Sequence, residues 1–492
     1  MSLPRVSLLL CVLALGACAK KRAPAKESEP VAEPTPVIAS VERKPGRVPA
    51  DLRWLAFGGG SDPLSNQVSL AQDLELASRS FAGRGMMLFA SGARAPVAIL
   101  RSEERASSVR LAVSRVLGPA GAEGIRYQPT TLAVDAPATR ELVLDALRGA
   151  LQTPGEPLLI LAASHGERGE VARQSSLALW GGWGVSVEDV AELLDREESV
   201  RPTRLVVTAC YGGGFAELAF VGADPQRGER APTHCGLFAA PWDDESSGCD
   251  PDANRVRQES FTIHFLSALR GEDRNGRRAE IDLDHDGKVS LLEAHAWARI
   301  HARSFDVPTT TSGRYLREHA PTNGAGRALE PEEQSVITAL STELELDDER
   351  AARSKLRELE RILDDAATLL DDAQAGSDDT YTALRIALLE RWPLLDHSWD
   401  PEAEAVLDRE ATSILQLLTE SELAQQHEAM QRELADAAAT HDSVRIARAR
   451  VQRLVHAFET TRLAGALERQ GGAHWAHYRA LRDCERFAPA LR

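Results

Sequence analysis

Residues 157–166 read PLLILAASHG and residues 204–214 read RLVVTACYGGG, and these two stretches decide the fold. Each begins with a short apolar run of the kind that a buried parallel strand needs. Between them, residues 186–194 have the apolar spacing of a helix. A strand, a helix and a strand form a right-handed crossover, which makes the strands parallel and brings both carboxyl ends to one edge of a sheet. Ligands bind at that edge in open α/β sheets.

Each run stops at a residue that can do chemistry, His165 in the first and Cys210 in the second. A thiol near its usual pKa is mostly protonated at neutral pH, whereas the thiolate is the nucleophile. An imidazole at the same edge can take that proton and later protonate a leaving amine. We therefore expect a general base at His165, a nucleophile at Cys210, and an oxyanion hole formed by the N–H groups of Gly166 and Cys210. The alternative is an inert buried thiol and a structural loop histidine.

The same residues resemble a known family. The His-Gly pair at 165–166 and the segment TACYGG at 208–213 are similar to the signatures of the caspase-like cysteine peptidases. The His-to-Cys distance and the following run GLFAAP at 236–241 resemble the legumain branch most closely. The acidic residue that often precedes the catalytic Cys in such peptidases is replaced here by Thr208 and Ala209.

This resemblance spans about residues 54–315 and leaves the C-terminal third of the chain uncovered. It implies an α/β fold with a mostly parallel sheet between helices. It also implies endopeptidase activity on a protein or peptide through His165 and Cys210, with Gly166 in the oxyanion hole. No organic cofactor is implied.

Two loops are candidates for substrate binding. The loop after the predicted strand 52–57 lies at the active-site edge in the family, which makes Asn66 and Gln67 candidate contacts, although Asn66 is at least as well placed to cap the helix that begins near Val68. In the family, residues after the strand at 236–239 line a specificity pocket. Asp243 and Asp244 there would attract Arg or Lys before the cut bond. A solvated acidic loop is the alternative.

Length and charge limit the function further. A chain of 492 residues with 43% hydrophobic residues is long enough for two or more domains. The formal net charge of −17 argues against a nucleic-acid partner, because phosphate binding needs a basic surface.

The N-terminus has the pattern of a targeting segment. Residues 1–18 combine an early Arg with an apolar core too short to span a bilayer. The sequence LGAC at 15–18 resembles a bacterial lipobox, which implies cleavage before Cys18 and lipidation of its thiol. Ala19 favours the outer membrane by analogy with bacterial sorting. Residues 19–50 are rich in Pro and charge and form a disordered tether. We expect a protein of the bacterial cell envelope that contacts the membrane through its lipid only.

Cysteine usage suggests one disulfide. Cys235 and Cys249 enclose a predicted strand and a polar loop, and in an oxidising compartment we expect them to pair. Cys484 has no evident partner in the sequence.

Residues 282–293 read DLDHDGKVSLLE and match an EF-hand calcium loop, with the turn glycine at the sixth position and glutamate at the twelfth. The exiting helix is expected at 292–303, but residues 271–278 are polar and make a weak entering helix. A tight acidic turn is the alternative to a Ca²⁺ site. The predicted ligand residues are Asp282, Asp284, Asp286, Lys288, Ser290 and Glu293.

We expect a caspase-like domain over residues 51–328, in which a helix at 101–117 belongs to a lid or surface insertion. Residues 329–492 carry apolar positions three and four apart, which predict an all-α bundle or coiled coil. That domain would offer helices to a partner, cover the active site, or stabilise the chain passively.

Two other functions remain open. One is a catalytically silent, calcium-binding interaction lipoprotein on a peptidase fold. The other is a peptide ligase or transpeptidase, because an amine can resolve a thioester in place of water.

Overall fold

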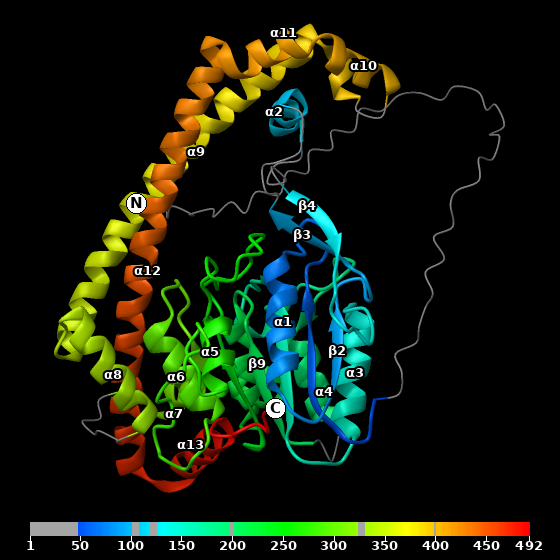
Figure 1. The fold of residues 1–492 in the computed structure, drawn as a ribbon. Helices are drawn as coiled ribbons and strands as arrows, with labels where there is room; N and C mark the ends of the chain where they lie inside the picture. The colour runs from blue at the N-terminus through cyan, green and yellow to red at the C-terminus, as the bar shows by residue number, and fades with distance from the viewer. Residues whose placement is uncertain (1–47, 101–107, 119–124, 197–200, 323–329, 398–399) are drawn as a thin grey trace, which may run out of the picture. The chain divides into compact units, whose positions relative to one another are not determined.

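The computed structural model describes residues 48–492 except 101–107, 119–124, 197–200, 323–329 and 398–399. Its centre is a six-stranded sheet in the order β11-β10-β9-β5-β1-β2 (Figure 1). Of these six strands, five are parallel and the short edge strand β11 is antiparallel. The strands are β1 (Leu52–Gly59), β2 (Arg84–Phe89), β5 (Leu158–Ser164), β9 (Thr203–Val207), β10 (His234–Phe238) and β11 (Thr309–Thr310).

Helices cover both faces of this sheet, because side chains alternate between the faces along each strand. In β5, Leu159 and Leu161 belong to one core, whereas Leu158 and Ile160 belong to the other. The predicted fold class is confirmed: α/β with a mostly parallel sheet between helices, followed by an all-helical C-terminal region. The first core includes α1 (Val68–Ser80), α5 (Phe261–Leu269) and α6 (Leu291–His301), and the second includes α3 (Arg140–Gln152) and α4 (Val187–Arg196).

The predicted crossover joins β5 to β9 through α4. The two strands are hydrogen-bonded neighbours in parallel register, with Leu158 opposite Thr203 and Ala162 opposite Val207. Their carboxyl ends therefore lie at the same edge of the sheet, as the sequence predicts. A small three-stranded sheet occupies the connection between β5 and α4; its strands are β6 (Gly166–Glu167), β7 (Ser176–Leu177) and β8 (Val185–Ser186).

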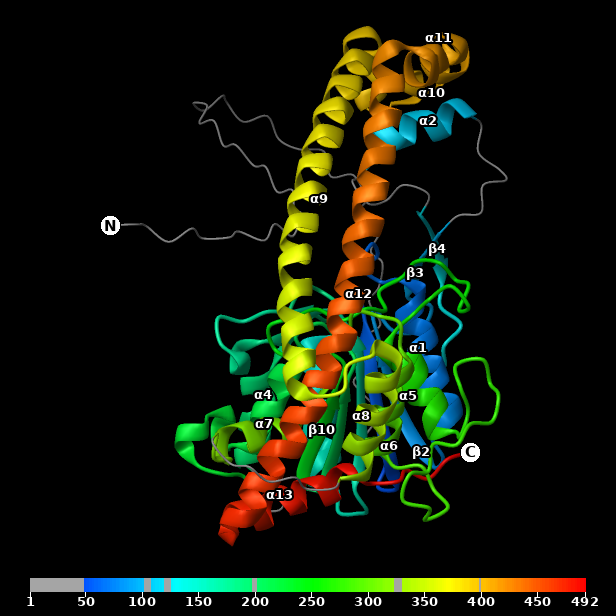
Figure 2. The same ribbon diagram turned by 90° about the vertical axis from the view of Figure 1, so that its left-hand side faces the viewer.

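The C-terminal region is dominated by two long helices, α9 (Glu349–Arg391) and α12 (Glu422–Gln470), which lie side by side (Figure 2). Four buried positions of α9 repeat every seven residues, as in the seam of a coiled coil. Thr380 bonds to His427 and Ser377 to Gln431, so the pair is antiparallel. The predicted helical seam is present, and its repeating positions are Ala352, Leu359, Ala366 and Ala373.

A segment from the N-terminal half packs on this helical pair. The helix expected at 101–117 is α2 (Ser108–Leu117), and residues 101–107 lie outside the described part of the chain. Val109, Val113 and Val116 of α2 join one apolar cluster with Leu384 and Leu388 of α9. The insertion therefore supports the far end of the α9–α12 pair, together with α10 (Pro401–Arg409) and α11 (Ala411–Leu415).

The predicted disulfide between Cys235 and Cys249 is wrong. Cys235 pairs with Cys484 of α13 (Gly472–Glu485), with a Cα–Cα distance of 6.1 Å. Cys235 is the second residue of β10, whereas Cys249 lies in the loop beyond the opposite end of that strand. Because a strand rises about 3.3 Å per residue, β10 itself holds the two thiols too far apart for a disulfide.

Helix α12 is anchored to the sheet domain by a buried arginine. Arg453 is 1% exposed and donates hydrogen bonds to the backbone carbonyls of Arg299, Ala302, Ser304 and Asp306. These carbonyls lie in the last turn of α6 and in the segment that follows it, where a cation is favoured. The described residues all belong to one compact unit.

Candidate active site at the edge of the sheet

The sheet brings His165 and Cys210 to one edge. His165 directly follows β5, and Cys210 follows the neighbouring strand β9 by three residues. The two backbones touch there: a Cβ added to Gly166 would lie 1.8 Å from the carbonyl oxygen of Cys210. Only glycine permits this approach, which gives the His-Gly pair its structural reason.

The imidazole of His165 is held by the loop after β1. Its Nε2 lies 2.8 Å from the carbonyl oxygen of Ser65 and 2.9 Å from Oε1 of Gln67. Both partners are acceptors, which assigns the proton of the neutral ring to Nε2 and leaves Nδ1 as the basic nitrogen. Nδ1 lies 3.5 Å from Sγ of Cys249.

The thiol of Cys210 is held by Ser246 on the loop after β10. The Ser246 amide donates to Sγ at 3.3 Å, and the thiol lies 3.5 Å from the Ser246 carbonyl oxygen. In the described part of the chain, this thiol hydrogen bonds to Ser246 and not to His165. Burial raises the pKa of Cys210, the negative charge of Glu245 adds to the rise, and the Ser246 amide opposes it.

The turn after Cys210 begins at Tyr211, which has a left-handed φ of 57°, and a 3₁₀ helix, η2 (Gly212–Ala219), follows it. The glycines serve close packing: a Cβ on Gly213 would lie 2.7 Å from the carbonyl oxygen of Ala240. The sharp turn therefore comes from Tyr211, and the glycines let the neighbouring chain approach.

Cys249 is the residue that sequence reasoning missed. It is one of two free thiols among the described cysteines, the other being Cys210. Although the residue as a whole is exposed, protein atoms crowd its thiol, and this desolvation and the neighbouring Cys210 raise the pKa of Cys249. The direct thiol–imidazole contact at this edge is thus made by Cys249. The sequence would have pointed to Cys249 only if Cys235 had been paired correctly with Cys484, because Cys249 then remains a free thiol.

Two of the three carboxylates in the acidic loop at 243–245 are paired with α12. Asp244 lies 3.3 Å from Arg445 and 3.0 Å from Arg448, both on α12. Glu245 also pairs with Arg445, at 2.9 Å. Asp243 is exposed. The prediction that Asp244 attracts a basic substrate side chain is wrong for this arrangement, because α12 already neutralises it.

Asn66 is a structural residue. It is fully buried; its Oδ1 accepts from the Gly60 amide at 3.0 Å, and its Nδ2 donates to the Pro96 carbonyl at 2.6 Å. Its predicted contact with substrate is therefore wrong. The capping alternative is wrong as well, since α1 begins at Val68 and Gln67 stands at its N-cap position.

A buried carboxylate joins α12 to the candidate site. Asp306 is fully buried and accepts hydrogen bonds from the amide and hydroxyl of Ser247, at 2.6 and 2.7 Å. Ser247 follows the residue that contacts Cys210, and the Asp306 carbonyl accepts from Arg453 of α12. The C-terminal helix therefore reaches the thiol through two short paths, one through Arg445 and one through Arg453.

The acidic loop 282–293 partly fits a calcium site. Asp282, Asp284 and Glu293 offer oxygens within 4.8 Å of one another, and Gly287 makes the expected turn at φ 84°. The exiting helix is confirmed as α6, but α5 ends at Leu269 and no helix directly precedes the loop in this described segment. Both Glu293 oxygens accept hydrogen bonds from the loop, including from Ser290, which caps α6. Asp286 and Lys288 are exposed.

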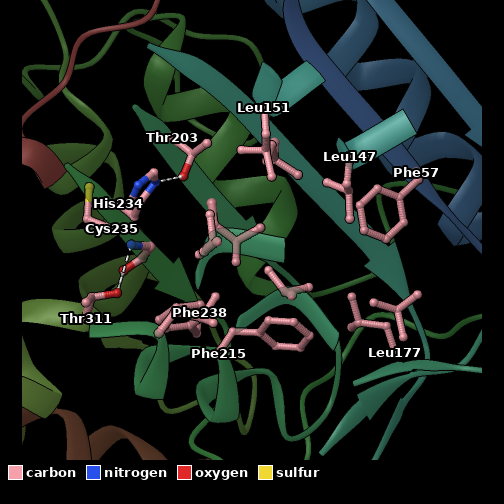
Figure 3. Close-up of a pocket in the computed structure, with 17 residues that line it drawn as sticks. Phe57, Leu147, Leu151, Leu177, Thr203, Phe215, His234, Cys235, Phe238 and Thr311 are labelled. Carbon is pink, nitrogen blue, oxygen red and sulfur yellow. Dashed lines mark hydrogen bonds between the residues drawn. The ribbon is translucent and has the colours of Figure 1, made fainter. Parts of the chain in front are cut away.

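A small apolar pocket lies elsewhere, between the sheet and helices α3 and α4 (Figure 3). Its volume of about 40 Å³ leaves room for little more than water. His234 and Thr203 on its wall bond to each other at 2.9 Å, and burial with the nearby Arg230 and Arg204 lowers the pKa of His234 to about 4. We interpret it as a gap in the core and not as a substrate site.

Two predictions on the N-terminus, lipidation at Cys18 and the tether at 19–50, fall on or mostly on residues 1–47, which lie outside the described part of the chain. Among the described helices, none is both long and apolar enough to cross a bilayer. No protein-family model matches the sequence, and no curated protein matches it significantly.

Proposed function

We propose that this protein is a cysteine endopeptidase that uses Cys210 as nucleophile and His165 as general base. The proposal rests on the arrangement of His165 and Cys210 at one edge of the sheet. There, the Gln67 and Ser65 oxygens orient the imidazole of His165, and its Nδ1 faces a thiol-bearing loop beside Cys210. An oriented imidazole next to a thiol is the arrangement that thiol catalysis needs.

In the proposed reaction, Nδ1 of His165 removes the proton of the Cys210 thiol. The thiolate attacks the substrate carbonyl, and the N–H groups of Gly166 and Cys210 bind the resulting oxyanion. His165 then gives the proton to the leaving amine, and water, activated by the same nitrogen, hydrolyses the thioester. An amine in place of water would make the reaction a ligation or transpeptidation.

Two free thiols, those of Cys210 and Cys249, lie at this edge, and either could in principle be the nucleophile. Cys210 is fixed by β9, by the left-handed turn at Tyr211 and by Ser246. Cys249, in contrast, is an exposed residue of a loop. A nucleophile needs fixed geometry, so we assign it to Cys210. Substrate binding then displaces Cys249 from Nδ1 of His165.

A second candidate is a catalytically silent interaction protein. It is favoured by the raised pKa of Cys210, which keeps the thiol protonated, and by the ion pairs of α12 on the loop that contacts it. The α9–α12 pair would then offer its surface to a helical partner.

Alkylation of the two thiols separates these candidates. Iodoacetamide labelling is followed residue by residue by mass spectrometry between pH 5 and 10, in the wild type and in His165→Ala. The peptidase proposal predicts that the apparent pKa of Cys210 rises when the imidazole is removed. An unchanged profile for Cys210 would favour the silent protein.

A Ca²⁺ ion is proposed for the loop 282–293, held by Asp282, Asp284 and Glu293 after Glu293 exchanges its bonds to Ser290. Calcium there would fix the loop that leads into α6. A rise in melting temperature with Ca²⁺ that is lost in Asp282→Asn and kept in Asp273→Asn supports the site; equal responses from both variants contradict it.

Lipid anchoring through Cys18 to the envelope, on the outer membrane, is likewise proposed from the N-terminal sequence. Metabolic labelling with palmitate tests it. The label should be present in the wild type and absent from Cys18→Ala.

A further inference from the structure

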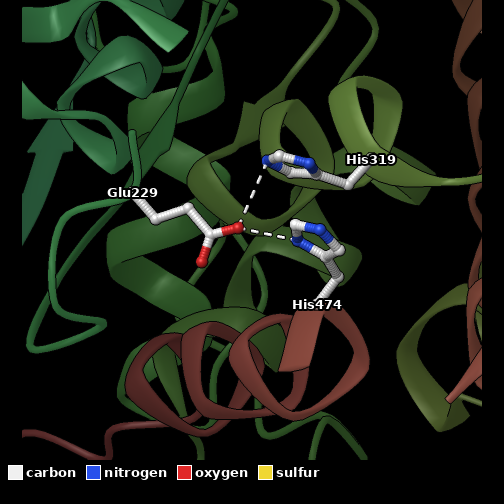
Figure 4. A group of neighbouring side chains, drawn as sticks. All are labelled: Glu229, His319 and His474. Carbon is white, nitrogen blue, oxygen red and sulfur yellow. Dashed lines mark ion pairs between the residues drawn. The ribbon is translucent and has the colours of Figure 1, made fainter. Parts of the chain in front are cut away.

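A second group of chemically active side chains lies away from the candidate active site, at the contact between α13 and α7 (Thr311–His319). Glu229, His319 and His474 each offer one ligand atom, and these atoms lie within 4.8 Å of one another (Figure 4). The three residues come from the loop before β10, the end of α7 and the first turn of α13. Segments far apart in the chain thus place two imidazoles around one carboxylate.

Distances in this cluster are close to those of a coordination sphere. Nε2 of His319 lies 3.6 Å from Oε1 of Glu229, and Nδ1 of His474 lies 2.7 Å from the same oxygen. Two ligands of a tetrahedral zinc ion at about 2.1 Å from the metal are about 3.4 Å apart. The distance between His319 and Glu229 is near that separation. The distance between His474 and Glu229 is that of a hydrogen bond, and it would lengthen by less than about 1 Å if a metal replaced the proton.

A further histidine, His477, lies beside these three residues and is a candidate fourth ligand. His477 is one helical turn after His474 on α13, and its Nδ1 lies 3.3 Å from Oε2 of Glu229. Tyr315 donates its hydroxyl to Oε1 of Glu229 at 2.6 Å, as an orienting residue around a metal-binding carboxylate does.

Hydrogen bonding within the cluster does not account for all of its buried nitrogens. Nε2 of His319 is buried and has no hydrogen-bond partner in the described structure. A buried polar atom without a partner calls for an explanation such as an ion. For His319 this is the same nitrogen that faces Glu229, so a metal between the two would satisfy it.

We propose that Glu229, His319 and His474, with His477 as fourth ligand, bind one Zn²⁺ ion. Three imidazoles and a carboxylate are donors that suit zinc and leave calcium or magnesium disfavoured. With four protein ligands the site is closed and structural. Since it ties α13 to α7 and to the loop of Glu229, zinc fixes the same helix that Cys484 joins to β10. The inference does not depend on peptidase activity.

The test uses the full-length chain carrying Cys210→Ala and Cys249→Ala, which removes the two free thiols of the described residues so that zinc cannot bind beside His165. Metal is stripped with a chelator, and Zn²⁺ is titrated by calorimetry. We expect one ion per chain, a dissociation constant of about 1 µM or tighter, and a higher melting temperature. His319→Ala and His474→Ala should each weaken binding on the order of 100-fold, whereas His441→Ala, on α12, should not change it.

Glu229→Gln keeps an acceptor for Tyr315 and serves as the variant least harmful to folding. It should lower zinc affinity at least about tenfold while the protein keeps its circular dichroism spectrum. X-ray absorption of the zinc-loaded protein should give nitrogen and oxygen ligands only, at about 2.0–2.1 Å. No binding in the Cys210→Ala/Cys249→Ala chain, or binding unchanged in both histidine variants, would overturn the proposal.

Discussion

Nη2 of Arg445 lies 2.9 Å from Oε2 of Glu245, so the long helix α12 contacts the loop that holds the thiol of Cys210. The guanidinium of Arg445 also stacks over the ring of Phe305, 3.8 Å from its centroid. An arginine fixed on both sides keeps its ion pair better than a free surface arginine does. The C-terminal helices are thus placed to influence the chemistry of the candidate site through charge.

Glu245→Gln tests that influence. The negative charge of Glu245 contributes to the raised pKa of Cys210, so its removal should lower that pKa. Alkylation of Cys210 at pH 7 should become faster, since a lower pKa raises the thiolate fraction. Asp243→Asn, which makes the same charge change at an exposed neighbour, should leave the rate unchanged. Equal acceleration in both variants would mean that only net charge matters.

Gly166→Ala should disrupt the contact between the two strand ends. Its Cβ would lie 1.8 Å from the carbonyl oxygen of Cys210, so one backbone must move. We expect loss of peptidase activity and a lower free energy of unfolding by about 2 kcal/mol or more. The matched change Gly376→Ala, on α9, meets only Sδ of Met430 at 3.2 Å and should be neutral or stabilising by up to about 1 kcal/mol. Urea unfolding of both variants checks this, and a stable, active Gly166→Ala protein would contradict the packing.

Cys484→Ser should destabilise the protein under oxidising conditions. The disulfide with Cys235 closes a sequence separation of 249 residues, and loss of such a bond costs about 2–5 kcal/mol. Denaturant unfolding without reductant measures the difference. Cys249→Ser, which removes a free thiol, should leave stability nearly unchanged. If Cys249→Ser is the destabilising variant, the pairing with Cys484 is wrong.

Three buried histidines should make the fold less stable in mild acid. Burial lowers the pKa of His234 to about 4, of His264 to about 4 and of His456 to about 3. Between pH 6.5 and 4 the unfolded chain therefore binds more protons at these residues than the folded chain. Stability is fully present above pH 6.5 and falls as pH decreases, by up to on the order of 3 kcal/mol for a residue such as His234.

The substitution His234→Gln tests the contribution of one of these histidines to the pH dependence of stability. The variant should show a shallower fall in the free energy of unfolding from pH 6.5 to 4 than the wild type, whatever its stability at pH 7. Identical slopes for the two proteins would show that His234 is not held neutral in the folded state.

The apolar strands at 157–163 and 204–209 and the crossover between them could be predicted because buried parallel strands leave a strong local pattern. The apolar seam of α9 could also be predicted, since its buried positions repeat along one face of the helix. The disulfide partner of Cys235 could not be predicted, because it depends on how α13, which carries Cys484 249 residues further along the chain, packs against β10.

The candidate site shows the same limit. His165, Gly166 and Cys210 stand at strand ends, where topology alone brings them to one edge. Gln67 and Cys249, which contact the imidazole, lie in loops whose course no periodicity fixes. Asn66 looked like a loop residue open to substrate, but its amide satisfies buried backbone groups. Charges on α12 reach the site only through tertiary packing.

The most direct test of the peptidase proposal is a peptide library digested by the full-length protein and read by mass spectrometry, with Cys210→Ala, His165→Ala and Cys249→Ala beside the wild type. Our account predicts new peptide ends from the wild type and from Cys249→Ala, and a loss of at least about a thousandfold in rate for Cys210→Ala and His165→Ala. Cleavage by Cys210→Ala at the wild-type rate, or no cleavage by any of the four proteins, would contradict it.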